Sequence, residues 1–276
     1  MLGFTAVLSK LIDWPTLVTV ASRSLIAMGC ITLFLIVKNK QILISKSDRL
    51  EASKSGLFLA IHWFTYFKAV EYSGIAIGLA SLFTFPIITA LIEPFWTKSR
   101  MVISHIISAI ICLVGIIILL HASMDSPKIL TGIGIGILSA MAYTFRNLIS
   151  KPLLSRIETP QLMLHQVFIS SMCFLLVIPI TDISLANISF SLSNIVYALL
   201  LGSFFTGLAH TLFIHGFQYF SASFVSILAA AQPFYGTLLG ILIVQEQPAV
   251  STWIGGGFIL LAIIYATLSQ SKTMAS

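Results

Sequence analysis

Charged residues are scarce in this chain, and their scarcity excludes an ordinary soluble domain. Only 9% of the 276 residues are charged and 58% are apolar, whereas about a quarter of the residues of a soluble domain carry charge. Apolar runs of about 20 residues, the length that a helix needs to cross a bilayer core, recur along the chain. We therefore expect a polytopic protein embedded in a lipid bilayer. The net charge of +6 then indicates basic residues on the cytoplasmic side and not a nucleic-acid partner.

Cysteines and catalytic motifs are also scarce. The three cysteines are odd in number and lie in apolar runs, which argues against a disulfide framework. The chain has no P-loop for ATP, no metalloprotease or serine-hydrolase motif, and no histidine pair with the spacing of a metal site. We expect no enzyme, no catalytic residue, no cofactor and no bound metal. The N-terminal sequence lacks a basic region and a small-residue cleavage site, so we expect no secretory signal peptide.

Apolar segments separated by polar breaks predict the fold. Each segment should be a helix, because an isolated strand leaves its backbone groups unsatisfied in lipid. We predict an all-α polytopic membrane protein with spans at residues 2–12, 15–37, 55–72, 74–96, 101–121, 129–150, 160–181, 193–215, 219–245 and 250–269.

The two halves of the chain repeat one pattern. His62 matches His210 and, after the loss of one residue, Pro86 matches Pro233. Each copy is an apolar helix, a short polar joint and a second apolar helix that carries the proline. Such a repeat indicates a carrier built from two related halves with its site between them. We predict the two repeats at residues 1–121 and 129–269.

Basic residues are distributed unevenly between the two ends of the predicted helices. If the loop 38–54 is cytoplasmic, the loops on the opposite side hold only Lys10 and Lys128. This asymmetry follows the positive-inside rule. It predicts that the second five-helix half is inverted relative to the first, and that the C-terminus faces the cytoplasm of a bacterial inner (plasma) membrane. The basic residues on that side are Lys38, Lys40, Lys46, Arg49, Lys54, Lys98, Arg100, Lys151, Arg156 and Lys272.

The first helix is shorter than its counterpart. Ser9 and Lys10 align with Ser150 and Lys151, but only nine residues precede Lys10. Nine helical residues rise roughly 14 Å, about half of the hydrocarbon thickness. We expect about ten residues of a full span to be missing, through a misplaced start or a real truncation. A functional short helix is the alternative.

Two stretches of sequence carry a family resemblance. TYFKAVEYSGIAIGLASLFTFPIITAL (65–91) resembles the third and fourth helices of the EamA branch of the drug/metabolite transporter superfamily. QPFYGTLLGILIVQEQPAVSTWIGGGFILLAIIYA (232–266) resembles its ninth and tenth helices. The resemblance covers nearly the whole chain. It implies ten helices around a central cavity, cytoplasmic termini and movement of small metabolites. The short first helix departs from that pattern.

Histidine and aromatic residues are the first candidates for the substrate site. His62 and His210 occupy equivalent repeat positions on helices that the resemblance places at the cavity, and a histidine there could bind substrate or pass a coupling proton. Trp63 and Tyr66 add aromatic surface beside His62. Plain packing of all four residues is the alternative.

Polar residues within other spans are further candidates. Arg23 lies near mid-membrane, as a counter-charge for an anionic substrate or as a structural arginine bonded to neighbouring helices. Tyr143 and Asn147 share one face of the sixth span, which the resemblance places at the cavity. Arg146 either lines the cavity or extends to the interface.

Prolines interrupt the fourth and ninth spans. Pro86 and Pro233 each remove one backbone hydrogen bond and should bend a helix at the cavity, as hinges or as structural kinks. Gln232, beside the second proline, is a candidate hydrogen-bonding group of the cavity.

Three further patterns concern packing and charge. Lys68 and Glu71 are expected to form an ion pair on one helix surface. Glu93 is expected to pair with Lys98 near the inner end of the fourth span. The pairs Gly74/Gly78, Gly132/Gly136 and Gly236/Gly240 predict close helix contacts.

These features favour a secondary carrier that moves a small metabolite, amino-acid-like or drug-like, by alternating access, with export as the expected direction. Alternatives are an uptake carrier for a nucleoside-like or amino-acid-derived metabolite, a channel, a non-transporting scaffold and, least favoured, a membrane-embedded enzyme. The expected partners are the substrate and the lipid bilayer. A coupling proton, and a monomer or a homodimer, stay open.

Overall fold

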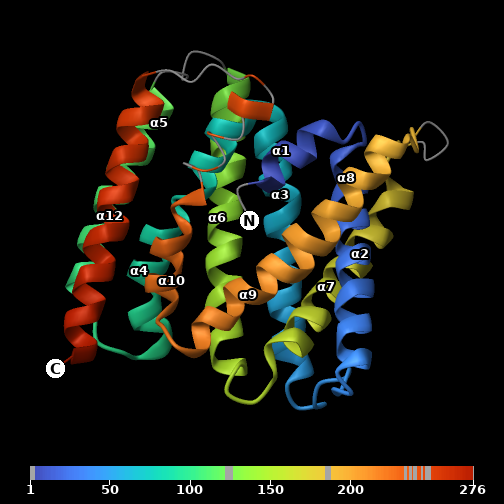
Figure 1. The fold of residues 1–276 in the computed structure, drawn as a ribbon, viewed down its shortest axis with the longest axis horizontal. Coiled ribbons are helices and arrows are strands. Elements are labelled where there is room, and N and C mark those ends of the chain that lie inside the picture. The colour runs from blue at the N-terminus through green and yellow to red at the C-terminus, as the bar shows by residue number, and fades with distance from the viewer. Residues whose placement is uncertain are drawn as a thin grey trace.

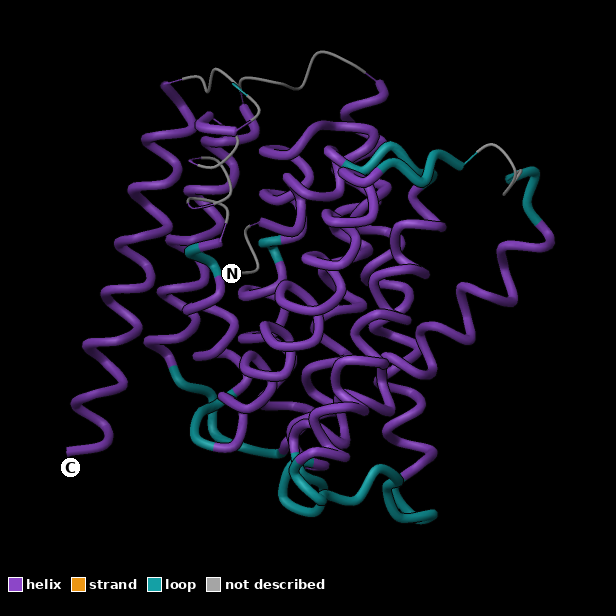
Figure 2. The backbone as a smooth tube through the Cα atoms, turned by 45° about the vertical axis from the view of Figure 1, so that its right-hand side comes forward, coloured by secondary structure: helices purple, strands orange, loops and turns teal. Residues whose placement is uncertain are grey.

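The computed structural model describes residues 4–121, 127–183, 188–232, 235, 238, 241–243, 245 and 250–275. Within these residues every regular element is helical (Figure 1, Figure 2). The first half contains α1 (Phe4–Leu11), α2 (Thr16–Val37), α3 (Arg49–Leu82), α4 (Phe85–Thr97) and α5 (Ile103–His121). The second half contains α6 (Pro127–Leu153), α7 (Thr159–Val177), η1 (Ile178–Ile180), α8 (Leu192–Gly202), η3 (Ser203–Leu208), α9 (Ala209–His215), η4 (Gly216–Gln218), α10 (Ala222–Ala229) and α12 (Val250–Ala275).

The helices form one bundle. Helices α3 and α6 run through its middle, α5 and α12 pack together at one side, and α2, α7 and α8 lie at the other (Figure 1). The connections after α2, α4, α6 and η4 all lie at the lower end of the bundle in Figure 1, and so does the C-terminal end of α12. This common end holds most of the basic residues that the charge pattern assigned to one side.

Five helices among the described residues are long and apolar enough to cross a membrane: Thr16–Val37, Ile77–Thr97, Pro127–Leu153, Thr159–Ile180 and Leu192–Gln218. Two shorter apolar helices cover Ile103–Ile118 and Trp253–Ser269. Helix α1 spans eight residues. The chain is therefore a multi-pass membrane protein, and its fold class is all-α.

Close packing of α3 on α6 depends on the predicted small residues. A Cβ atom added at Gly136 would lie 2.4 Å from Ser81 Cβ, and one added at Gly132 would lie 2.7 Å from Ser73 Cβ. Neither glycine could become larger without moving a helix, so both define the distance between α3 and α6.

The backbone of α3 is interrupted at Gly74, where φ is 84° and ψ is 172°. A positive φ is costly for residues with a Cβ atom, which explains a glycine at this position. The break separates the third predicted span from the fourth, and the helix begins at Arg49, six residues before the predicted start.

Pro86 does not bend a continuous helix, so the predicted kink is corrected. The chain turns at Phe83 and Thr84, and Pro86 stands in the first turn of α4. The physical reason is that a proline ring clashes with the carbonyl four residues earlier but is tolerated in a first turn.

In the second half, the helix is interrupted at the equivalent position. Helix α10 ends at Ala229, and a turn at Ala230 and Ala231 precedes Gln232. With the repeat offset of Pro86 and Pro233, this turn corresponds to Phe83 and Thr84. Pro233 itself lies outside the described residues.

Candidate functional site

A small cavity lies between the two halves of the chain and gathers most of the predicted site residues. Its volume is about 30 Å³. The lining residues are Thr5, Arg23, His62, Trp63, Tyr66, Leu79, Leu82, Phe83, Tyr143, His210 and Gln232. The first eight belong to the first predicted repeat and the last three to the second. Both helix breaks reach the cavity, through Phe83 and Gln232.

Histidine and aromatic rings pack against one another around the cavity. The rings of His62 and Tyr143 stack with their centroids 4.3 Å apart. The rings of His210 and Trp63 pack edge to face, with their centroids 5.4 Å apart. His62 Nδ1 lies 2.8 Å from Ser139 Oγ, and that hydroxyl donates to the His62 carbonyl oxygen at 2.9 Å. Because the hydroxyl proton is used in this way, Nδ1–H of His62 donates to Ser139.

Arg23 is the one cation among the described residues of the cavity lining. Its side chain is buried, its Nε donates to Thr206 Oγ1 at 2.9 Å, and its guanidinium carbon lies 4.5 Å from the ring centroid of Trp63 and 5.0 Å from that of Phe67. Cation–π contacts of this kind are worth roughly 0.5–2 kcal/mol each. No carboxylate pairs with Arg23 among the residues that the structure describes.

Three buried nitrogen atoms of the lining have no hydrogen-bond partner within the described part of the chain. They are Arg23 Nη2, Trp63 Nε1 and His210 Nδ1. Buried polar groups are nearly always hydrogen-bonded, because an unpaired one costs about 1–3 kcal/mol. Unpaired atoms around one cavity are what a binding site for a polar ligand would present.

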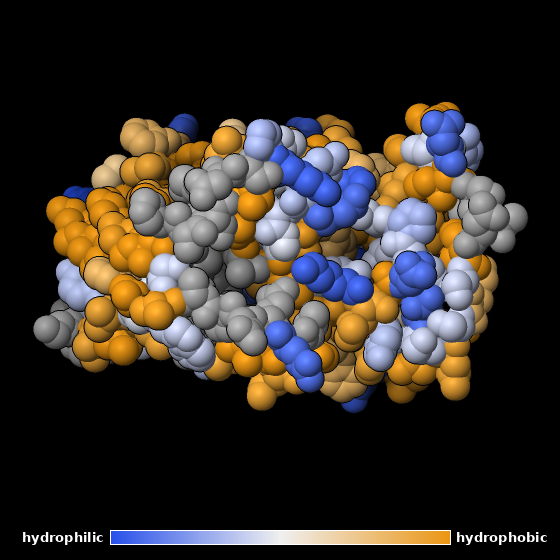
Figure 3. Space-filling model, turned by 90° about the horizontal axis from the view of Figure 1, so that it is seen from above, coloured by the Kyte–Doolittle hydropathy of each residue, from blue (hydrophilic) through white to orange (hydrophobic). Residues whose placement is uncertain are grey.

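Larger hollows lie above and below the cavity. The upper hollow, about 810 Å³, is lined by Lys10, Asp13, Phe67, Lys68 and Glu71 among others. Figure 3 looks onto this end, where hydrophilic side chains gather over the middle of the surface. The predicted ion pair of Lys68 and Glu71 is confirmed at 2.8 Å, and Thr16 Oγ1 also donates to Glu71 at 2.6 Å.

The lower hollow, about 560 Å³, lies at the loop end and is lined by Trp96, Lys151 and Phe217 among others. Aromatic side chains lie between the cavity and each hollow. Toward the upper hollow, the Arg23 guanidinium lies over the ring of Trp63, which lines the cavity, and over the ring of Phe67, which lines the hollow. Toward the lower hollow, the ring centroids of Tyr143 and Phe213 lie 5.5 Å apart, and those of Phe213 and Phe217 lie 5.2 Å apart.

Two predicted residues of α6 lie apart from the cavity. Asn147 is buried, is not among the lining residues, and accepts a hydrogen bond at Oδ1 from Arg146 Nη1 at 3.1 Å. Arg146 is also buried, and its Nε and Nη2 donate to Gln166 Oε1 at 3.1 and 2.7 Å. The alternative that Arg146 extends to the membrane interface is wrong, because Gln166 of α7 supplies an acceptor inside the bundle.

Glu93 does not pair with Lys98, and this expectation is corrected. Its Oε1 accepts from Lys151 Nζ at 2.9 Å. Helix α4 ends at Thr97 and is followed by Lys98, whose backbone is left-handed, whereas Lys151 comes from the neighbouring end of α6. The physical reason is that the helix end turns Lys98 away while a second helix presents a cation.

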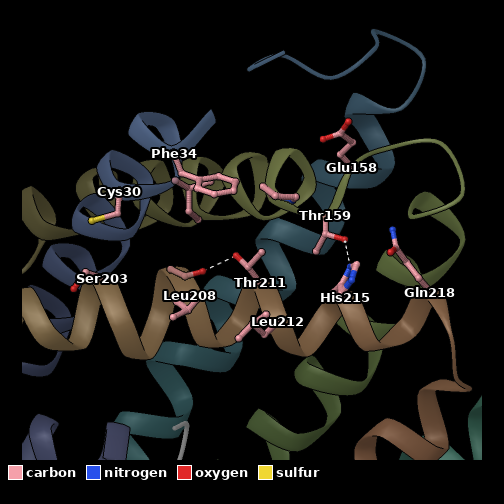
Figure 4. A pocket seen from close by; sticks show the side chains of 13 residues that line it. Cys30, Phe34, Glu158, Thr159, Ser203, Leu208, Thr211, Leu212, His215 and Gln218 are labelled. Carbon is pink, nitrogen blue, oxygen red and sulfur yellow. Dashed lines mark hydrogen bonds between the residues drawn. The ribbon is translucent and has the colours of Figure 1, made fainter. Parts of the chain in front are cut away.

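A separate groove lies on the side of the bundle, between α2, the start of α7 and the η3–α9 run (Figure 4). It has a volume of about 570 Å³ and contains none of the predicted site residues. Phe34, Leu208 and Leu212 line it, and Thr159 Oγ1 lies 3.2 Å from His215 Nδ1 at one end. The central cavity, with its buried polar groups, is therefore the better candidate site.

An all-helical multi-pass fold around a cavity shared by two halves is an architecture that membrane transporters use. The EamA-like transporter family model matches residues 1–121 and 130–268. The chain belongs to the EamA-like transporter family.

Two relatives agree with this assignment, and a solved structure shares the fold. The transporter YxxF of Bacillus subtilis (strain 168) is 24% identical over 216 residues, which cover 76% of this chain and 67% of YxxF. The transporter YwfM of the same organism is 26% identical over 211 residues, covering 75% of this chain and 69% of YwfM. One crystal structure superposes with a TM-score of 0.78 and 20% identity over 99% of this chain and 97% of the other, which shows the fold alone.

Sequence reasoning missed several residues of the site. Thr206 lies in η3, a π-helical turn, and was not considered because a lone threonine in an apolar run carries no signal. Leu79, Leu82 and Phe83 line the cavity because the chain breaks beside them. The proline two residues after Thr84 was the available signal for that break.

Proposed function

We propose that this transporter is a secondary carrier that moves a small metabolite, amino-acid-like or drug-like, by alternating access. The observation that carries the proposal is the order of spaces along the bundle. A small cavity shared by both halves stands between two larger hollows, with aromatic side chains on each side. Movement of the aromatic side chains on one side at a time would open the cavity to one side and then to the other.

The proposed architecture has ten spans in two inverted repeats, residues 1–121 and 129–269, with the C-terminus in the cytoplasm. The family match to both parts and the common end of the basic loops support it. Pro86 and Pro233 are the proposed hinges. The breaks at equivalent positions before the two prolines support this role. The first helix is proposed to be a shortened span.

The proposed substrate-binding residues are His62, Trp63, Tyr66, Tyr143, His210, Gln232 and Arg23, which line the cavity, with Asn147 behind them. The proposed direction is export, and His62 and His210 are the groups proposed to carry a coupling proton if transport is proton-driven. The proposed carrier works as a monomer or a homodimer.

A comparison of metabolites tests this function. Cells with and without the gene are grown side by side, and metabolites are quantified inside the cells and in the medium. Export predicts a compound that accumulates inside the cells when the gene is absent, and whose flux through the protein saturates with concentration. Unchanged metabolites on both sides, with the protein present in the membrane, would contradict the proposal. Flux that rises without saturation would favour a channel.

A further inference from the structure

We propose that the central cavity is a subsite for a carboxylate group, and that the substrate is an organic anion without an ammonium group. This inference rests on the proposed carrier function and narrows its substrate class. It follows from the hydrogen-bonding character of the lining, from the contacts of Arg23 and from the absence of an acidic residue among the described lining residues.

The first argument is the burial of Arg23. Only 1% of its surface is exposed, and an ionised guanidinium inside a bundle requires strong compensation. The described contacts provide one hydroxyl acceptor and two aromatic faces. Its Nη2 remains unpaired within the described residues. An anionic ligand would supply the missing counter-charge and an acceptor for Nη2.

The second argument is the way in which Arg23 is held. Thr206 Oγ1 accepts from Arg23 Nε and donates to the Leu201 carbonyl oxygen at 2.6 Å, five residues earlier. Thr206 lies in the π-helical turn η3, a rare geometry that occurs frequently at functional sites. Because Thr206 engages Nε, the guanidinium is fixed in orientation. Thr206 is therefore a positioning residue.

The third argument is the kind of atom that is unpaired. Arg23 Nη2 and Trp63 Nε1 can only donate, and His210 Nδ1 donates in one of its two tautomers. A carboxylate is acceptor-only and offers about four lone-pair positions, so it matches this set of donors. The cavity of about 30 Å³ exceeds the roughly 10–15 Å³ that one water molecule requires, so it offers room for a small polar group and not for a whole metabolite.

The same features disfavour a cation. The described lining offers no carboxylate to an ammonium group. The faces of Trp63 and Phe67, which could bind a cation, are already covered by Arg23. The remaining rings, Tyr143 and Phe83 among them, suit an apolar or aromatic body attached to the carboxylate.

Ligand pairs that differ only in charge test the subsite on the full-length chain in detergent. The probes are 3-phenylpropanoate, indole-3-acetate and hexanoate, each with its neutral amide and with an amine of the same body. We expect the carboxylates to raise the midpoint of thermal unfolding, and the amides and amines to leave it unchanged. Equal shifts for carboxylate and amide, or no shift with any carboxylate, would overturn the proposal.

Variants show which residues produce the preference for carboxylates. Arg23→Gln should abolish the preference for carboxylates, Arg23→Lys should retain part of it, and Thr206→Val should weaken carboxylate binding by up to about tenfold, which is 1.4 kcal/mol. Arg100→Gln, at an exposed position far from the cavity lining, is the matched control and should behave as the unmodified chain. A folded Arg23→Gln protein with an undiminished carboxylate preference would overturn the assignment. If Arg23→Gln does not fold, two measurements still test the proposal: ligand binding by the unmodified chain and carboxylate binding by Thr206→Val.

Flux measurements on the same probes in lipid vesicles separate this inference from the proposed function. Carboxylates that bind with dependence on Arg23 but never cross would support the subsite and contradict the carrier. Saturable flux of an amine or amide, with no carboxylate binding or competing, would support the carrier and overturn the subsite.

Discussion

The carboxylate of Glu93 caps the helix that contains Ser223. Glu93 Oε2 accepts from the Ser223 backbone N–H at 2.7 Å and from the Ser223 hydroxyl, while Oε1 accepts from the Ala222 N–H at 2.8 Å. These are the first N–H groups of α10, which lack partners within the helix. With Lys151 added, Glu93 connects α4 of the first half to α6 and α10 of the second beside the lower hollow.

Replacement of Glu93 should therefore destabilise the protein. Glu93→Gln loses the charge that faces Lys151 and the N-terminus of α10, and places an amide where two donors meet. We expect a loss of about 2 kcal/mol in the free energy of unfolding, because hydrogen bonds to charged groups are worth about 1.5–3 kcal/mol. Unfolding of the purified protein in detergent measures it.

Glu51→Gln is the control for this change. Glu51 also pairs with a lysine, Lys54, at 2.6 Å, but both side chains are about half exposed. Surface pairs contribute about 0–1 kcal/mol, so this variant should lie close to the unmodified protein. Equal effects of the two substitutions would show that the helix cap formed by Glu93 adds nothing to the free energy of unfolding.

The contact of α3 with α6 gives a second prediction. Gly136→Ala should destabilise the protein by about 1–3 kcal/mol, the usual cost of overpacking, because its Cβ atom would overlap Ser81. Gly134→Ala, on the same helix with nothing within 4 Å, should leave stability unchanged or raise it by up to about 1 kcal/mol. Thermal unfolding of the two variants in one detergent compares them, and a Gly136→Ala protein as stable as Gly134→Ala contradicts the packing described.

The buried Arg146 gives a third prediction. Gln166 Oε1 accepts from two of its nitrogens, and Gln166 Nε2 donates to Ser55 and Ser150 at 2.9 and 2.8 Å. Gln166→Leu would remove the main acceptor of a buried cation and should cost about 3–5 kcal/mol. Gln166→Glu supplies a counter-charge and should be tolerated better. Protein yield and unfolding in detergent measure the stability of both variants. A Gln166→Leu protein as stable as the unmodified chain would contradict a stabilising role for this hydrogen-bond network.

The proposed orientation gives a fourth prediction. In a chain whose native cysteines are replaced, a cysteine at Lys128 should react with a membrane-impermeant maleimide on intact cells. A cysteine at Arg100 should react only after the cells are permeabilised. Both positions are exposed; Lys128 lies in the first turn of α6 and Arg100 follows α4, and these helix ends lie at opposite ends of the bundle (Figure 1). Reaction of the Arg100 cysteine on intact cells would reverse the proposed sidedness.

Much of the fold follows from the sequence, because lipid allows few alternatives to a helix. The span at 15–37 differs from α2 by one residue at its start, and the predicted boundary at residue 73 coincides with the break at Gly74. The prediction that Pro86 bends a continuous helix was wrong, since a pattern of apolar residues does not distinguish a bent helix from two helices separated by a turn.

The lining of the cavity followed in part from the repeat. His62 and His210 were singled out because they match, and Arg23 because a charge in a span is costly. The contact of Thr206 with Arg23 could not be predicted, since the position of Thr206 depends on a π-helical turn that no residue type indicates. The partners of Arg146 and Glu93 come from other helices, so only the packed bundle reveals them.

The most direct test of the account is the flux of the exported metabolite through cavity variants. Once the metabolite comparison has identified the compound, its concentration-dependent flux is measured in vesicles that contain equal amounts of protein. We predict saturable flux for the unmodified chain, flux reduced about tenfold or more for Trp63→Leu, which loses a cavity wall and the ring under Arg23, and unchanged flux for Ile61→Leu, on the exposed face of the same helix. Unchanged saturable flux in Trp63→Leu would contradict a substrate site in this cavity.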